Sequence, residues 1–150
     1  TEAFMAALLH DFGVPVQERV DSAGVKKLLE AIAKDPEAPI AALESSLVRV
    51  THGRCAEVVF ENWRLPQSIV VAAKHHDDPA QAPEAARDLA TLVHLGVQLA
   101  LEAGFTHPLE PRQLRIPREP LLKAMGLDEA AFGSIIEGLS ERVHLMVEAA

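Results

Sequence analysis

Cysteine is almost absent from the chain, since Cys55 is the only one among 150 residues. A single cysteine excludes an intrachain disulfide and a zinc site built on cysteines, and a lone thiol suits a reducing compartment such as the cytoplasm. The chain also lacks any apolar run near the ~20 residues that a bilayer span requires, and it shows no signal peptide. We therefore expect a cytoplasmic protein without a membrane association.

Basic residues are scarce as well. Fourteen Lys and Arg stand against 22 Asp and Glu, which gives a formal net charge of −8. Such a chain offers little of the cationic surface that a phosphate backbone requires, so nucleic acid is disfavoured as a partner. Several enzyme signatures are also missing from the sequence: Gly-x-Gly-x-x-Gly, a phosphate-binding loop that ends in Lys-Ser/Thr, and the Gly-x-Ser-x-Gly of serine hydrolases.

Tyrosine is missing and aromatic residues make up only 4% of the chain, which disfavours a β-rich fold. Hydrophobic residues make up 49%, so a buried core can form. Alanine and leucine recur at helical spacing, and we predict an all-α fold in one domain over residues 1–150. The predicted helices cover residues 1–12, 25–32, 40–50, 52–63, 66–76, 85–103 and 128–147.

Helix-ending and helix-starting residues set the predicted boundaries. Gly13 and Pro15 should end the first helix, and residues 85–103 should form the longest one. Residues 107–120 hold four prolines and should form a rigid, mostly non-helical connector. Asp128 should cap the start of the last helix. The chain begins directly in an apolar helical pattern, so we expect that a further segment lies upstream of Thr1.

Histidines and acids provide the candidate chemistry. Adjacent His10 and Asp11 can both reach a metal beyond a helix end, and His52 opens a predicted helix. A second His-His pair, His75 and His76, ends another helix and is followed by acids. Paired metal ions are what many phosphohydrolases use to activate water. The candidate metal ligands are therefore His10, Asp11, His52, His75 and His76.

Each of these residues also has a purely structural interpretation. Asp11 could accept a hydrogen bond from His10 or from the backbone, and His52 could contact a helix end without a metal. His75 and His76 lie where the helix macrodipole favours a cation. Other residues are predicted to be structural only: a half-buried His94, surface His107 and His144, a small buried Cys55, and Trp63 as a packing anchor at a helix corner.

Several segments resemble a known family. The string AFMAALLHDFG at residues 3–13 resembles the "AFLAGLLHDIG" segment of the HD superfamily. His52, Trp63, Leu65 and Pro66 resemble the "H-x(10)-W-x-L-P" pattern of HDOD domains, and His75-His76-Asp77 follows at about the expected distance. The strings LATLVHL at residues 89–95 and LKAMGL at 122–127 resemble two later elements of that family.

The resemblance implies an HD-like bundle of about six to eight helices and a link to bacterial signal transduction. It also implies that this chain is the C-terminal, HD-like part of an HDOD domain, without the N-terminal helical half. HD enzymes bind metal through a His…His-Asp…Asp set. In this chain the first histidine would lie upstream of Thr1, and Val97 would occupy the place of the last aspartate, where an aliphatic side chain cannot bind a metal.

Two functions follow from this degenerate ligand set. The first is a non-catalytic regulatory module that acts by binding a protein partner and needs no cofactor. The alternative is a metal-dependent HD-type phosphohydrolase for nucleotides or cyclic dinucleotides, with a divalent metal and with Asp77 or Asp78 in place of the missing acid. The sequence leaves open whether copies of the chain associate as a homo-oligomer.

Overall fold

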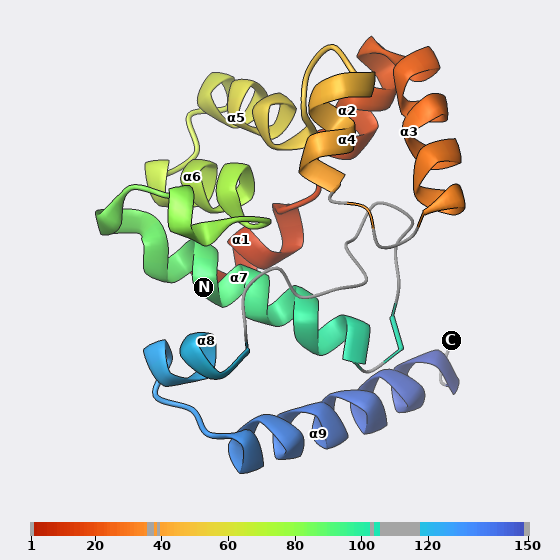
Figure 1. The fold of residues 1–150 in the computed structure, drawn as a ribbon. Helices are drawn as coiled ribbons and strands as arrows, with labels where there is room; N and C mark the ends of the chain where they lie inside the picture. The colour runs from red at the N-terminus through yellow and green to blue at the C-terminus, as the bar shows by residue number, and fades with distance from the viewer. Residues whose placement is uncertain (1, 36–37, 39, 103, 106–117, 149–150) are drawn as a thin grey trace.

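The computed structural model describes residues 2–35, 38, 40–102, 104–105 and 118–148. These residues form helices and connecting turns, with no strand among them, so the all-α prediction is confirmed. Figure 1 shows the course of the chain from α1 to α9. The elements are α1 (Glu2–Leu9), α2 (Gly13–Val20), α3 (Ser22–Lys34), α4 (Ile40–Leu47), α5 (His52–Asn62), α6 (Gln67–His75), the 3₁₀ helix η1 (Pro79–Gln81), α7 (Glu84–Glu102), α8 (Arg118–Ala124) and α9 (Glu129–Glu148).

Helix α6 is the centre of the bundle. Its five consecutive residues 69–73 are all buried, which is the pattern of a helix that is covered on every side. Val70 and Ala73 pack on α5, Ala72 packs between α1 and α7, and Val71 packs against Ala82 and α7. Because α6 is packed on three sides, the residues at its C-terminal end have a fixed position in the bundle.

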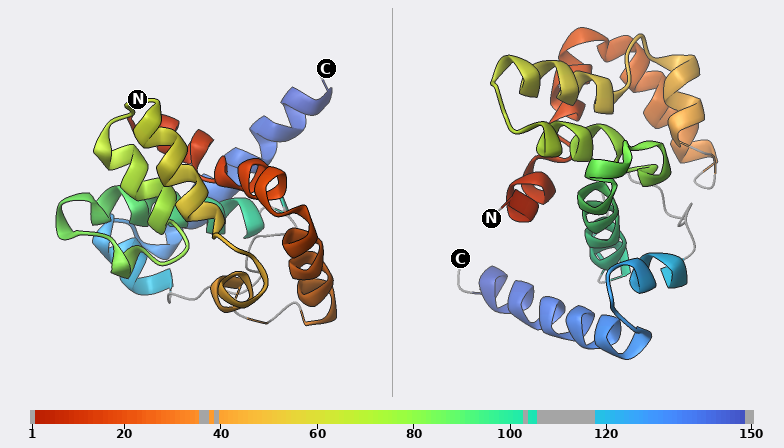
Figure 2. Two further views of the ribbon diagram at one scale, coloured as in Figure 1. Left: turned by 90° about the horizontal axis from the view of Figure 1, so that it is seen from above. Right: turned by 90° about the vertical axis from the view of Figure 1, so that its left-hand side faces the viewer.

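Helices α6 and α7 separate two groups of helices. Helices α2 to α5 lie on one side of them, and α8 and α9 lie on the other, as the views in Figures 1 and 2 agree. The second group packs through a small cluster of Leu95, Leu122 and Phe132. Arg118 supports this contact, since its guanidinium pairs with Glu102 and Glu129 and lies 4.9 Å from the centroid of the Phe132 ring. Among the described residues, no helix has the length and apolar character that a bilayer crossing requires.

The predicted helix over residues 1–12 is wrong at its end. Helix α1 ends at Leu9, and a second helix, α2, begins at Gly13 and runs through Pro15. Proline is tolerated in the first turn of a helix because its missing N–H would have no intrahelical partner there. Gly13 is required by packing, because a Cβ at this position would lie only 1.8 Å from the carbonyl oxygen of His52.

Other boundary predictions have mixed outcomes. His52 does begin a helix, and the Asp128 carboxylate does cap α9, since it accepts a 2.7 Å hydrogen bond from the backbone N–H of Ala131. The 19-residue α7 is not the longest helix, because α9 has 20 residues. Helix α8 begins at Arg118, inside the predicted connector, with Pro120 in its first turn. Residues 107–117 of that connector, with His107, lie outside the described residues, as does the side chain of His144.

Trp63 differs from its predicted role as a core anchor, since it is 55% exposed. Its ring leans against Phe12 and Phe60, with ring centroids 5.0 and 6.0 Å apart. Trp63 is the C-cap of α5, and the next residue, Arg64, turns the chain away with a φ of 57°. The indole therefore covers the edge of a core cluster, and its outer face meets solvent.

Candidate functional site

The His10-Asp11 pair lies in the tight turn between α1 and α2. The N–H of Phe12 donates to the carbonyl of Leu9 at 3.0 Å, and the N–H of Val14 donates to the carbonyl of Asp11 at 2.9 Å. His10 lies with its Nδ1 2.7 Å from the carbonyl oxygen of Ala7. A carbonyl can only accept, so Nδ1 carries the proton and Nε2 is turned toward Asp11.

His52 is the first residue of α5, and a buried acid holds its imidazole. The Nδ1 atom lies 2.8 Å from Oε1 of Glu44, a residue of α4 that is only 2% exposed. The carboxylate accepts from Nδ1–H, so Nε2, on the opposite edge of the ring, faces Asp77 and Asp11. The N-terminus of α5 is capped by Thr51, whose hydroxyl accepts from the N–H of Arg54.

His76 follows the last residue of α6 and is held at both its ring and its backbone. Its Nδ1–H donates to the carbonyl of Ala73 at 2.9 Å. Its own carbonyl accepts from Nδ1 of His94 on α7 at 2.7 Å. His94 is only 5% exposed, so the predicted half-buried position is wrong. The helix end that presents His76 is therefore tied to α7, and Asp77 comes next in the chain.

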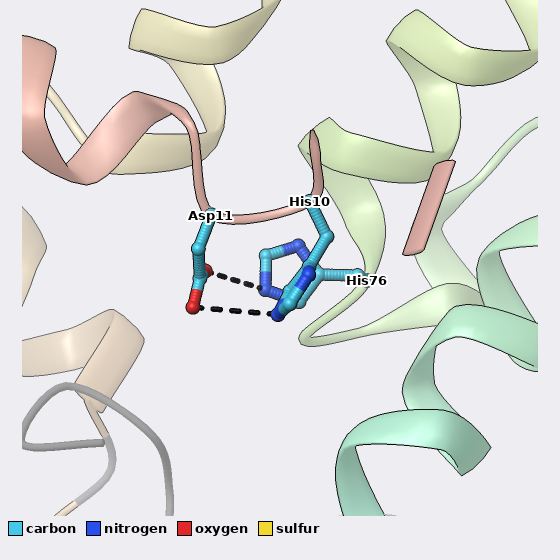
Figure 3. A group of neighbouring side chains, drawn as sticks. All are labelled: His10, Asp11 and His76. Carbon is cyan, nitrogen blue, oxygen red and sulfur yellow. Dashed lines mark ion pairs between the residues drawn. The ribbon is translucent and has the colours of Figure 1, made fainter. Parts of the chain in front are cut away.

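Three imidazole Nε2 atoms converge on two carboxylates, as Figure 3 shows for His10, Asp11 and His76. Oxygens of Asp11 lie 3.3 Å from Nε2 of His10, 3.4 Å from that of His76 and 4.0 Å from that of His52. Asp77 oxygens lie 3.4 Å from Nε2 of His52 and 3.7 Å from that of His76. We call these five residues, His10, Asp11, His52, His76 and Asp77, the histidine–aspartate cluster.

The cluster changes the acidity of its members. Burial by itself would raise the pKa of the Asp11 carboxyl, but His10 and His76 outweigh it and lower that pKa well below its usual range. Burial would likewise lower the pKa of His52, but its hydrogen bond to Glu44 and the charges of Asp77, Glu44 and Asp11 raise it to about 9. Without a metal, His52 is therefore a positively charged imidazolium at neutral pH, and an ion bound at Nε2 would displace the proton from that nitrogen.

The spacing within the cluster fits a divalent ion. The Nδ1 atoms make hydrogen bonds of 2.7 to 2.9 Å, whereas the Nε2 atoms stand 3.3 to 4.0 Å from the carboxylates. Charge-assisted hydrogen bonds would be shorter, at about 2.7–2.9 Å. Two ligands of one tetrahedral ion, each about 2.1 Å from it, lie about 3.4 Å apart. An imidazole held through Nδ1 with Nε2 directed at the site is also the usual arrangement of a metal-ligating histidine.

The ligand atoms divide into two groups of three. One group is His10, Asp11 and His76, and the other is His52, His76 and Asp77. His76 belongs to both, and its single Nε2 lone pair can bind one ion at a time. Of the predicted ligands, His75 is in neither group. It is half-buried in the wall of a cavity, and burial, with the nearby charge of Lys74, lowers the pKa of His75.

A cavity of about 240 Å³ opens beside the cluster. His52 and Asp77 of the cluster line it, and Arg54 and Lys74 from α5 and α6 add positive charge to its wall. Both cations are already paired with Glu57, Lys74 at 2.8 Å. Asp78, the other candidate for a replacement acid, lines this cavity and accepts a 2.8 Å hydrogen bond from Gln81.

Glu44 and Gln17 were not identified as site residues from the sequence. Gln17 is fully buried in α2 and donates to Glu44 and to the carbonyl of Val50, each at 2.8 Å. A signal for Glu44 was present, because this carboxylate lies among the apolar positions Ile40, Leu43 and Leu47 of a helix. A charged residue at a core position needs a buried partner.

Comparisons with known proteins identify the family of the chain. The sequence profile of the HDOD domain matches residues 1–79. The chain belongs to the HDOD domain family. The matched segment contains the whole histidine–aspartate cluster together with Glu44. A search of curated proteins found no match.

A solved structure resembles this HDOD chain over nearly its whole length. It is the crystal structure of a "Putative signal transduction protein" from Marinobacter aquaeolei VT8, with a TM-score of 0.80 and 26% sequence identity. The similarity covers 94% of this chain, so it extends through helices beyond the profile match. The chain corresponds to only 30% of the length of that protein.

Proposed function

We propose that this HDOD chain is a regulatory signalling module that acts by binding a protein partner, without hydrolysing phosphate esters. Its family and the description of its structural neighbour support a signalling role. Because the chain spans less than a third of that neighbour, the activity of the whole protein is part of the proposal. We further propose that the histidine–aspartate cluster holds at most one divalent ion, and that the protein works in the cytoplasm.

The shared position of His76 is the observation that carries the non-hydrolytic proposal. Two-metal phosphohydrolases hold their ions about 3.5–4 Å apart, so that one activates water and both stabilise the phosphoryl oxygens. The described ligand groups both depend on Nε2 of His76, so filling one group removes a ligand from the other. Val97, at the position where the family resemblance would put a ligand acid, is a partly buried aliphatic residue of α7.

An apolar surface on α1 supports the protein-binding half of the proposal. Phe4 is 68% exposed, Leu8 64% and Met5 38%, and their spacing puts them side by side on one face of the helix. We call these three residues the α1 apolar strip. Ala6, on the opposite side of α1, packs against α6 and α7. Contiguous exposed apolar surface is typical of contact sites for other proteins.

Metal content and turnover test the non-hydrolytic proposal together. The purified protein would be incubated with Mn²⁺, Fe²⁺, Zn²⁺ or Ni²⁺, desalted and analysed for bound metal, and assayed with p-nitrophenyl phosphate, bis-p-nitrophenyl phosphate, nucleotides and cyclic dinucleotides. We expect no more than one ion per chain and no turnover. Turnover that Asp11→Ala abolishes would show that the protein is an enzyme, whether one ion or two are bound, and two ions per chain would show that the cluster is not limited to one.

The strip is tested by charge insertion. Phe4→Asp/Leu8→Asp keeps the fold if the strip meets only solvent or a partner, and Lys26→Asp on α3 provides an exposed control. A protein that crosslinks to the wild type and to the control, but not to the strip variant, would support the proposal. Equal crosslinking by all three would contradict it.

The cavity favours a second candidate function, metal-dependent phosphohydrolysis. It opens next to His52 and Asp77, and an anionic substrate there would lie near Arg54 and Lys74, which also pair with Glu57. If the cluster held metal in this case, the ion would polarise a phosphate oxygen and lower the pKa of a bound water. Asp77, which faces both His52 and His76, would then replace the missing acid. The same metal and turnover assays decide between the two functions.

A further inference from the structure

Glu44 holds His52 by an arrangement that goes beyond a simple salt bridge. One oxygen, Oε1, lies 2.8 Å from Nδ1 of His52 and also accepts from the backbone N–H of His52 at 3.1 Å. The same oxygen accepts from the side-chain amide of Gln17 at 2.8 Å. The ring and the backbone of His52 are thus both bonded to Oε1 of Glu44, and Gln17 from α2 holds the same oxygen in place.

Burial makes this arrangement rigid. Gln17 is 0% exposed, Glu44 2% and His52 6%, so water does not compete for these contacts. The carboxylate also lies at the N-terminus of α5, where the first N–H groups of a helix lack intrahelical acceptors and where the macrodipole favours negative charge. The three residues come from α2, α4 and α5, and the network therefore sets where these helices present His52.

We infer that Glu44 is a positioning residue, which holds the His52 imidazole with Nδ1 protonated and directs its Nε2 lone pair at the metal position of the histidine–aspartate cluster. The metal-binding part of this inference rests on the proposed function in its form with one divalent ion bound in the cluster. Carboxylates that accept from the far nitrogen of a ligating histidine fix its tautomer and orientation, and their loss typically costs about 10–100-fold in metal affinity.

Two measurements on a matched set of variants test this role. Glu44→Gln keeps an accepting oxygen without the charge, and Glu44→Met keeps the length without an acceptor. Glu57→Gln and Glu57→Met provide controls, since Glu57 pairs with Arg54 and Lys74. The first measurement is the Nδ1–H signal of His52 in ¹⁵N–¹H correlation spectra of metal-free protein. The second is the Kd for Zn²⁺ by competition with a chromophoric chelator.

We expect Glu44→Met to lose the Nδ1–H signal and to weaken Zn²⁺ binding about 10–100-fold. Glu44→Gln should keep the signal and lose less affinity, and both Glu57 controls should match the wild type. A Glu44→Met protein with the wild-type signal and affinity would overturn the inference. So would an affinity loss of the same size in the Glu57 variants.

The design separates failure of the inference from failure of the proposed function. If wild-type protein binds no Zn²⁺, the metal-binding part of the inference fails while the proposed function, which allows at most one ion, still stands. The Nδ1–H signal alone then decides whether Glu44 orients His52. If Glu44→Met does not fold, as judged by circular dichroism, Glu44→Asp replaces it, because the shorter side chain withdraws the oxygen but keeps the charge. A shifted signal and weaker binding in Glu44→Asp support the inference, and an unchanged signal overturns it.

Discussion

Gly13 offers the sharpest test of how this fold positions its site. A Cβ built on Gly13 would lie 1.8 Å from the carbonyl oxygen of His52, 2.6 Å from its carbonyl carbon and 2.9 Å from the backbone nitrogen of Ala56. Ordinary contact begins at 3.4 Å, so the closest atom falls short by 3.4 less 1.8, or about 1.6 Å. All three atoms belong to the backbone of α5, and no side-chain rotation can make room.

Gly13→Ala must therefore separate the start of α2 from α5. Overpacking a well-packed interior typically costs about 1–3 kcal/mol, and we expect the upper end because only a helix shift relieves the overlap. For a chain of this size, about 3 kcal/mol lowers the melting temperature by about 10 °C. The same shift would move Asp11, two residues earlier, away from His52, so Zn²⁺ affinity should fall as well.

Urea unfolding followed by circular dichroism measures the effect, with Gly96→Ala as the matched control. Gly96 is an exposed position within α7, and a Cβ there would meet nothing within 4 Å. That control should be stabilised by about 0.5–1 kcal/mol, since alanine is the better helix former. If Gly13→Ala is as stable as Gly96→Ala, the close approach of α2 to His52 is wrong, and so is the argument that packing fixes the distance from Asp11 to His52.

Two further predictions concern stability. Folding raises the pKa of His52 from 6.5 to about 9, so protonation of His52 contributes on the order of 3 kcal/mol to the free energy of unfolding below pH 6.5, and this contribution is lost as the pH rises through about 9. Urea unfolding of chelator-treated protein between pH 6 and 10 should show this loss of stability. The His52→Asn variant should show a flatter dependence of stability on pH. Trp63→Ala should lower the free energy of unfolding by about 1–2 kcal/mol instead of the 3–5 kcal/mol of a core tryptophan, because Trp63 is 55% exposed. A loss above 3 kcal/mol in urea titration would show that Trp63 is a core anchor after all.

Much of the fold could be predicted because apolar periodicity and capping residues act locally. His52 at the start of α5 and Asp128 before α9 are signals of this kind, and both were identified correctly. Helix α2 was missed because Gly13 and Pro15 usually end helices. Here the glycine is needed for close packing against His52, and the proline occupies a first turn, so neither residue acts as a breaker.

The candidate site was only partly predictable, because its geometry is created by packing between helices that are distant in sequence. The sequence pointed to His10, Asp11, His52 and His76, but no spacing rule could separate His76 from its neighbour His75. That choice depends on the end of α6, where the ring of His76 bonds back to Ala73 and its carbonyl is fixed by His94. His75, one position earlier, is rotated by about 100° around the helix axis and lies in the cavity wall instead.

Helix α7 holds part of the site in place without contributing a residue to the histidine–aspartate cluster. His94 donates to the His76 carbonyl and receives a 3.1 Å hydrogen bond from the side-chain amide of Gln98, so two buried polar residues of α7 fix the turn that presents His76 and Asp77. Val97, between them, is aliphatic and offers no ligand atom. Loss of an acid at this position would remove charge and a ligand, but it would leave the supporting hydrogen bonds intact. We therefore expect His94 and Gln98 to hold this turn whether or not the cluster binds a metal, so the fold and the chemistry of the site have to be tested separately.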